Sequence, residues 1–182
     1  MSLAPKQRMT VDEFLAWSEA TPGRFELRNG VVIEMQAERV GHATTKFAIQ
    51  TALAAAIQRA NIPCRVFPDG VTVRIDNGTA FEPDALVYCG PPLLKEMLEV
   101  PNPIVVVEVL SPSTKATDFS AKLDGYFRVA SVMHYLIVDP QQLPIIHHRR
   151  QPDGSIQTKL VGQGLLRLDP PGIELNVDGL LD

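Results

Sequence analysis

The chain has 182 residues, 45% of them apolar, and a formal net charge of −4, so it can bury a substantial core and we expect one domain over residues 1–182. The negative charge argues against a protein that coats nucleic acid by general electrostatic attraction, although a local basic groove remains compatible with it. No apolar run approaches the ~20 residues of a membrane span, and the N-terminal segment lacks the apolar core of a secretory signal. We therefore expect a cytoplasmic protein without a membrane partner.

The sequence contains two cysteines, Cys64 and Cys89. They lack the close paired spacing of zinc ligands, and two cysteines are too few for the disulfide framework of a small secreted protein. The sequence therefore predicts neither a disulfide framework nor a cysteine zinc site.

The N-terminal part predicts a short helix, a hairpin and a long helix. Thr10 and Glu13 have the spacing of a capping box, which indicates the start of the short helix. Two extended runs within residues 24–35 flank Asn29-Gly30, a favoured two-residue hairpin turn. A long helix over about 43–60 is predicted from apolar residues at helical spacing and from alanines suited to close packing. The apolar residues at this spacing are Phe47, Leu53 and Ile57.

The middle of the chain predicts strands, one of which contains a carboxylate. Residues 64–75 indicate one strand, and Glu82-Pro83-Asp84 introduces another over 85–88. The β-branched run over 104–110 is typical of a strand buried on both faces, yet Glu108 lies inside it. A buried carboxylate is costly in free energy unless a cation or a metal compensates it.

A turn at residues 111–114 ends that strand, and a helix begins near Asp118. Positions three and four residues apart share one face of a helix. One face of this helix is mostly apolar but includes a lysine, so it packs on the sheet and Lys122 points into the protein. A lysine in that place needs a carboxylate partner, and Glu108 is the nearest along the chain. The residues of this face are Phe119, Lys122, Leu123, Tyr126 and Phe127.

The C-terminal part predicts a buried strand over 133–138 and a second hairpin formed by 145–150 and 155–161. Helices therefore alternate with groups of strands along the whole chain. This order predicts an α/β fold with a mixed β-sheet flanked by helices and additional β-hairpins.

The first strand of the second hairpin carries a basic cluster, which consists of His147, His148, Arg149 and Arg150. Strand alternation sends His147 and Arg149 to one face and the other two to the opposite face. The cluster could contact a phosphate backbone, or it could be the solvated charge that protects an edge strand.

Three residues stand apart as candidates for chemistry: Asp84, Glu108 and Lys122. Two carboxylates on neighbouring strands form an oxygen site that Mg²⁺ accepts, with waters and phosphate oxygens completing its shell. Such an ion polarises a phosphate and lowers the pKa of a bound water, and a nearby ammonium can orient that water or offset the growing charge. A buried salt bridge that only holds a strand to a helix explains the same residues, and the sequence leaves both interpretations open.

The order Pro83-Asp84, Glu108-Val109-Leu110 and Lys122 resembles the PD-(D/E)XK nuclease superfamily. From about Met9 onward, the chain resembles the Uma2 family, also called DUF820, within that superfamily. Each matching segment is weak alone, but in this order and at these spacings they are specific for the family. The further matches are Phe25-Glu26-Leu27 with Asn29-Gly30, His42 at the start of the long helix, Glu82, residues 107–114, Asp118 with Tyr126, and residues 135–140.

This resemblance implies a restriction-endonuclease-like fold and a bound Mg²⁺, with Mn²⁺ as a substitute. The implied metal ligands are Asp84, Glu108 and the backbone carbonyl of Val109. The superfamily's usual lysine lies two residues after the second acid, where this chain has Leu110. Lys122 is then the migrated replacement, which reaches the same space from the helix.

The remaining candidates each have two interpretations. Glu26 matches the family's early acidic position and could assist catalysis, or it could be a polar residue of a half-buried hairpin. His42 could bind phosphate or assist proton transfer, or it could be an exposed cap residue. Tyr126 lies one turn after Lys122 and could hydrogen-bond the site, or it could be a half-buried core tyrosine.

These features predict a metal-dependent endonuclease that hydrolyses DNA phosphodiester bonds. A homodimer is expected with it, because two sites related by a two-fold axis cut the two strands of a duplex most easily. One alternative is a non-catalytic nucleic-acid-binding or regulatory module that retains the nuclease fold. A second alternative is a structural interaction protein in which the acids form ion pairs.

Overall fold

The computed structural model describes residues 8–110 and 118–180, and the turn predicted at 111–114 and the side chain of Phe119 lie outside the described part. Helices occupy Val11–Glu19 (α1), Val40–Ala60 (α2) and Asp118–Arg128 (α3). The strands before α3 are Phe25–Arg28 (β1), Val31–Glu34 (β2), Arg65–Pro68 (β3), Val73–Asp76 (β4), Thr79–Phe81 (β5), Ala85–Tyr88 (β6) and Val105–Val109 (β7). The strands after α3 are His134–Asp139 (β8), Gln142–Arg150 (β9), Ile156–Val161 (β10), Leu165–Leu168 (β11) and Ile173–Asn176 (β12).

A six-stranded mixed sheet forms the centre of the fold, with the strand order β10-β9-β8-β7-β6-β3. Strands β7 and β8 are parallel, and the crossover between them contains α3. The other neighbouring pairs of this sheet are antiparallel. Strands β2-β1-β5-β4 form a second sheet, and β11 pairs with β12. This architecture confirms the predicted α/β fold with a mixed sheet and additional hairpins.

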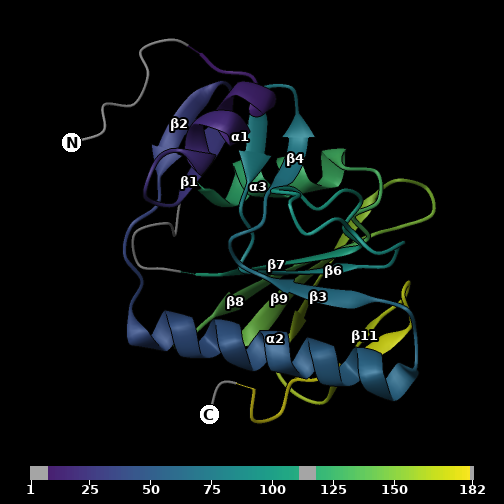
Figure 1. The fold of residues 1–182 in the computed structure, drawn as a ribbon. Helices are drawn as coiled ribbons and strands as arrows, with labels where there is room; N and C mark the ends of the chain where they lie inside the picture. The colour runs from purple at the N-terminus through teal and green to yellow at the C-terminus, as the bar shows by residue number, and fades with distance from the viewer. Residues whose placement is uncertain (1–7, 111–117, 181–182) are drawn as a thin grey trace.

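The central sheet is covered on both faces (Figure 1), which explains why β7 reads as an almost continuous apolar run. Helix α2 and the β11–β12 hairpin lie against one face, which contains Val105, Val107 and Val109. Helix α3 and the second sheet lie against the other face, which contains Val106. Glu108 alternates with the valines and therefore faces α3.

The predictions for the first short helix and the first hairpin are confirmed. Thr10 and Glu13 form both hydrogen bonds of the capping box at the start of α1. Asn29 and Gly30 join β1 to β2 with φ angles of 49° and 79°, the left-handed conformation that a two-residue hairpin turn requires. This hairpin matters for the site because β1 carries Glu26.

Two predicted elements differ from the structure. The strand predicted over 64–75 is two strands in different sheets, β3 and β4, because the chain turns after Pro68 and Gly70 adopts a φ of 96°. The long helix starts at Val40, and Phe47 on it is 70% exposed, whereas Leu53 and Ile57 are buried as expected. Among the described helices, α2 included, none has both the length and the apolar character needed to cross a membrane.

The structure also contains a disulfide between Cys64 and Cys89, which the sequence did not predict. These cysteines lie just before β3 and just after β6, and the register pairs Arg65 with Tyr88. They are therefore cross-strand neighbours, although 25 positions separate them in the sequence. The spacing of two cysteines along a chain carries no information about such a pairing, since only the sheet register creates it.

The close packing of α3 on β5 yields a first prediction. A Cβ atom at Gly125 would lie 2.5 Å from Cε2 of Phe81, so Gly125→Ala must push the helix away from the sheet. We expect a loss of about 1–3 kcal/mol in the free energy of unfolding, as for other overpacked cores. Urea unfolding followed by circular dichroism measures this value.

Gly41→Ala is the matched control, because Gly41 is also helical but a Cβ there meets nothing within 4 Å. This substitution should be neutral or stabilise the protein by up to about 1 kcal/mol through helix propensity. Equal stabilities of the two variants would show that α3 does not approach Phe81 this closely.

Candidate active site

Asp84 and Glu108 meet where strands β6 and β7 pair. The antiparallel register places Ala85 beside Val107, and the backbone N–H of Asp84, one residue before β6, donates to the carbonyl of Val107 at 3.0 Å. The backbone N–H of Val109 donates to Oδ2 of Asp84 at 2.7 Å, which fixes this carboxylate against β7. Two acids that are distant in the sequence are thus held near each other, and the carboxylate of Asp84 acts on the pKa of Glu108.

Lys122 on α3 reaches these acids from the opposite layer. Its Nζ donates to both carboxylate oxygens of Glu108, at 2.8 and 2.9 Å, and lies 2.8 Å from Oε1 of Glu26. Lys122 is buried, as the spacing of α3 predicted. Its ammonium group is therefore shared between two carboxylates that come from different sheets.

Tyr126 follows Lys122 by one helical turn and also contacts Glu108. Its hydroxyl donates to Oε1 of Glu108 at 2.5 Å, while its ring packs against Phe81 and Tyr135. Burial and the nearby Glu108 carboxylate raise the pKa of Tyr126 well above its ordinary value. The residue therefore has both of the roles that the sequence left open, since it is buried in the core and hydrogen-bonded to the site.

Glu26 belongs to the same cluster and is buried. Its carboxylate accepts from the backbone N–H of Glu82 at 3.2 Å and from Arg28 at 2.8 Å. Burial raises its pKa, but Lys122 and Arg28 more than offset this effect, so the pKa of Glu26 is lowered. Glu26 is thus a charged group that holds Lys122 in place, rather than a polar residue left on a half-buried hairpin.

The pKa of Glu108 is shifted in the opposite direction to that of Glu26. Burial, together with the carboxylates of Asp84 and Glu26, raises the pKa of Glu108 to about 8, although Lys122 acts in the opposite direction. Lys122 is shared with Glu26, which also has Arg28, so Lys122 offsets the burial of Glu108 only in part. Burial likewise raises the pKa of Asp84. Without metal, ionisation of Glu108 is therefore less favourable than ionisation of Glu26.

His42 approaches the acids from α2, on the other side of β7. Its Nε2 lies 2.8 Å from the carbonyl oxygen of Val109 and 3.8 Å from Oδ2 of Asp84. A carbonyl oxygen can only accept, so Nε2 carries the hydrogen. Nδ1 is buried without a hydrogen-bond partner in the described part of the chain, and it lies 3.6 Å from Oε2 of Glu38. His42 is therefore an inward-facing part of the cluster and not an exposed cap.

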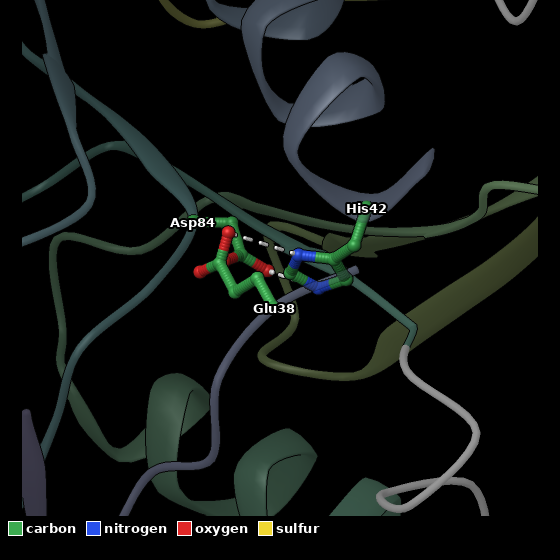
Figure 2. Close-up of side chains that lie close together, drawn as sticks. All are labelled: Glu38, His42 and Asp84. Carbon is green, nitrogen blue, oxygen red and sulfur yellow. Dashed lines mark ion pairs between the residues drawn. The ribbon is translucent and has the colours of Figure 1, made fainter. Parts of the chain in front are cut away.

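Glu38, His42 and Asp84 together form a group that could hold a metal ion. One ligand atom from each lies within 4.8 Å of the others. Figure 2 shows their side chains turned toward one another, with ion-pair distances from His42 to both acids. Carboxylate oxygens suit Mg²⁺ and Mn²⁺, and an imidazole nitrogen is a further ligand for transition metals such as Mn²⁺. The unpartnered Nδ1 and the convergent oxygens fit a divalent cation.

Lys46 adds a second buried ammonium group, which the sequence analysis missed together with Glu38. Its Nζ donates to Asp69 at 2.8 Å and also to Glu38, and lies 3.7 Å from Oδ1 of Asp84. Burial lowers the pKa of Lys46, but these carboxylates raise it above its ordinary value.

A sequence signal for these residues existed. Glu38, His42, Lys46 and Gln50 recur at every fourth position, so they lie along one stripe of α2 and its N-terminal approach. Gln50 completes the stripe by donating to the backbone carbonyl of Asp84 at 2.8 Å. A polar stripe at helical spacing beside an apolar face could have indicated a second wall of the site.

The fold and this cluster define a restriction-endonuclease-like α/β protein. The model of the Uma2 family, described as "Putative restriction endonuclease", matches residues 11–178. The chain therefore belongs to the Uma2 family, as its motifs predicted.

The chain is also similar to one solved structure and to two proteins of Synechocystis sp.. The fold matches the crystal structure of a "putative nuclease belonging to DUF820" from Anabaena variabilis, with a TM-score of 0.72, 16% identity, and coverage of 95% of this chain and 97% of that one. The uncharacterized protein slr1290 of Synechocystis sp. is 26% identical over 153 residues, which are 84% of this chain and 80% of the relative. The uncharacterized protein sll1609 of the same organism is 23% identical over 167 residues, which are 90% and 93% of the two chains.

The raised pKa of Glu108 makes stability depend on pH in the absence of metal. Between the ordinary value of 4.5 and the value of about 8 in the fold, the folded state holds a proton that the unfolded state has lost. The contribution of this group to the free energy of unfolding therefore falls as pH rises through this range. Glu108→Gln, which does not titrate, should remove that part of the pH dependence.

Urea unfolding in the presence of EDTA, at several pH values between 4.5 and 8, checks this expectation. Asp124→Asn is the matched control, since Asp124 is an exposed acid on the same helix and should leave the dependence intact. If wild type and Glu108→Gln lost stability equally as pH rose, Glu108 would not carry the proton.

Proposed function

We propose that this protein is a divalent-metal-dependent endonuclease that hydrolyses DNA phosphodiester bonds. The observation that carries the proposal is the buried ammonium of Lys122, held 2.8 Å from both Glu108 and Glu26 beside the second acid, Asp84. A salt bridge that only tied a helix to a strand would need one acid and one base. Here several acids and two lysines converge from three layers of the fold, and such a concentration of buried ionisable groups is typical of a functional site.

The proposed ligands of Mg²⁺, or of Mn²⁺ in its place, are Asp84, Glu108 and the carbonyl oxygen of Val109. That oxygen accepts from His42, and its second lone pair leaves it able to bind a cation. The carboxylate of Glu38 and Nδ1 of His42 are further proposed metal ligands, on the side of Asp84. The bound ion supplies a polarised phosphate oxygen and a water of lowered pKa. Because metal ligands must be deprotonated, Glu108 would hold the ion as a carboxylate.

The chain's own residues have separate roles in this proposal. Lys122 orients the attacking water or offsets negative charge that grows on the phosphate oxygens. Glu26 is a positioning residue, because it holds the ammonium group of Lys122 from the opposite side. Tyr126 positions the Glu108 carboxylate through its hydroxyl group. A two-fold homodimer, which we also propose, would present one such site to each strand of a duplex.

Plasmid cleavage with Mg²⁺ or Mn²⁺ tests the function. Asp84→Asn and Lys122→Met should each lower the cleavage rate by at least about 100-fold, since each removes a group that acts on developing charge. Isothermal titration calorimetry with Mn²⁺ should show binding to the wild type and loss of binding in Asp84→Asn. Lys122→Met should still bind the ion, because lysine is not a ligand.

The matched control is again Asp124→Asn, an exposed acid on α3, which should cleave at the wild-type rate. Circular dichroism confirms that each variant is folded. A folded wild type that binds DNA in EDTA but never cleaves it would instead identify a nucleic-acid-binding or regulatory module. Absence of both DNA and metal binding would leave only a structural role for the ion pairs.

A further inference from the structure

A second set of charged residues lies on the opposite face of the central sheet from Glu108 and Lys122. A cavity of about 540 Å³ opens there between the β9–β10 hairpin and β11. It is separate from the acids because Ile145 and His147 alternate onto the α2 face, whereas Glu108 faces α3. The cavity is lined by His147, Arg149, Gln157, Lys159, Val161, Leu165, Leu166, Arg167 and Asp169.

Half of the predicted basic cluster faces this cavity. His147 and Arg149 line it, as the strand alternation predicted, and His148 and Arg150 face the other side. Arg150 has a structural role, because its guanidinium donates to the backbone carbonyls of Phe127 and Val129 at the end of α3. The alternative of a charged edge strand is wrong for β9, since β10 pairs with it on the outer side.

Sheet register concentrates positive charge in the cavity. Lys159 pairs with His147 and Gln157 pairs with Arg149, so both partners project from β10 to the same side. Arg167 from β11 adds a third cation, and its Nη2 lies 3.4 Å from Oδ2 of Asp169, the acid that lines the cavity with them. The lining therefore has a surplus of two positive charges on a chain whose net charge is −4.

The buried pair of His134 and His147 determines which ring nitrogens donate and which accept at one wall of the cavity. Nε2 of His134 lies 2.9 Å from the carbonyl of Pro170, so this nitrogen carries the hydrogen and Nδ1 accepts. Nδ1 lies 2.9 Å from Nε2 of His147, which must therefore donate. Burial lowers the pKa of both rings to about 4, so both are neutral. Nδ1 of His147, a residue that lines the cavity, is then a hydrogen-bond acceptor.

Arg149 is incompletely satisfied. Its Nη2 donates to the carbonyl of Asp169 at 2.8 Å, but its Nε is buried without a partner among the residues that the structure describes. A buried donor without an acceptor is costly in free energy, and an anion that accepts from the guanidinium would relieve that cost through charge-assisted hydrogen bonds. The remaining walls are apolar, through Val161, Leu165 and Leu166.

We propose that this cavity binds a small phosphate monoester of mononucleotide size. A phosphate monoester carries a charge of about −1.5 to −2 at neutral pH, which matches the surplus of the lining. The volume lies within the range of about 300–1,000 Å³ of small-molecule sites. Arg149, Lys159 and Arg167 receive the phosphate, the apolar wall receives the base, and Nδ1 of His147 accepts from a hydroxyl or N–H of the ligand.

Isothermal titration calorimetry with adenosine 5′-monophosphate tests the proposal, in EDTA so that no metal takes part. The wild type should bind with a dissociation constant below about 1 mM. The double variant Lys159→Gln/Arg167→Gln should bind at least about tenfold more weakly, since two charge-assisted contacts are lost. The side chains of Lys159 and Arg167 are exposed, so we expect the double variant to fold like the wild type.

The matched control is Arg65→Gln/Lys95→Gln, which removes the same charges from exposed positions outside the cavity and should keep the wild-type affinity. Adenosine and inorganic phosphate should each bind at least about tenfold more weakly than the nucleotide, because each lacks half of the contacts. Asp84→Asn should bind the nucleotide like the wild type, which keeps this test independent of the proposed nuclease activity.

Three results would overturn the inference. The first is no binding of the nucleotide to the folded wild type, or equal binding to the cavity variant. The second is equal affinity for inorganic phosphate and the nucleotide, which would exclude a ligand that uses the apolar wall. The third is loss of binding in Asp84→Asn, which would place the nucleotide at the acids on the other face.

Discussion

The shared ammonium group of Lys122 is the interaction on which the candidate site depends. Glu26 and Glu108 are carboxylates removed from water, and neither would be tolerated without a cation. Lys122 lies between them and joins α3 to strands of two different sheets. Arg28 gives Glu26 a second cation and the pKa of Glu26 is lowered, whereas burial and the carboxylates of Asp84 and Glu26 raise the pKa of Glu108 although Tyr126 also donates to it.

The central sheet imposes the geometry around that cluster. Strand β7 is apolar on both faces and pairs with β6 and β8, so its position is strongly determined by burial. Asp84 is held against β7 by the backbone N–H of Val109, and the polar stripe of α2 approaches it. Lys122 and Lys46 come from opposite layers of the fold: Lys122 donates to Glu108, and Lys46 lies 3.7 Å from Asp84.

The same sheet separates two chemical environments. On the α3 face, Glu26 and Glu108 are paired with Lys122 and Arg28. On the α2 face, the β9–β10 hairpin and β11 leave cations in excess around a partly apolar cavity. Alternation along β9 produces this division, because Arg150 turns toward the end of α3 while Arg149 turns toward the cavity. The basic cluster of the sequence is thus divided between two faces: His147 and Arg149 line the cavity, whereas His148 and Arg150 face the opposite side.

The sequence by itself determined what local patterns encode: the turn at Asn29-Gly30, the buried strand around Glu108, and the inward direction of Lys122 on its helix. Tertiary structure decided what depends on register between distant segments, which includes the division of residues 64–75 between two sheets and the pairing of Cys64 with Cys89. The roles of Glu38 and Lys46, and the cavity around Arg149, belong to the same class. The physical reason is that helix and strand periodicity reports which neighbours share a face, whereas the partner that a face meets is fixed only when strands pair and layers pack.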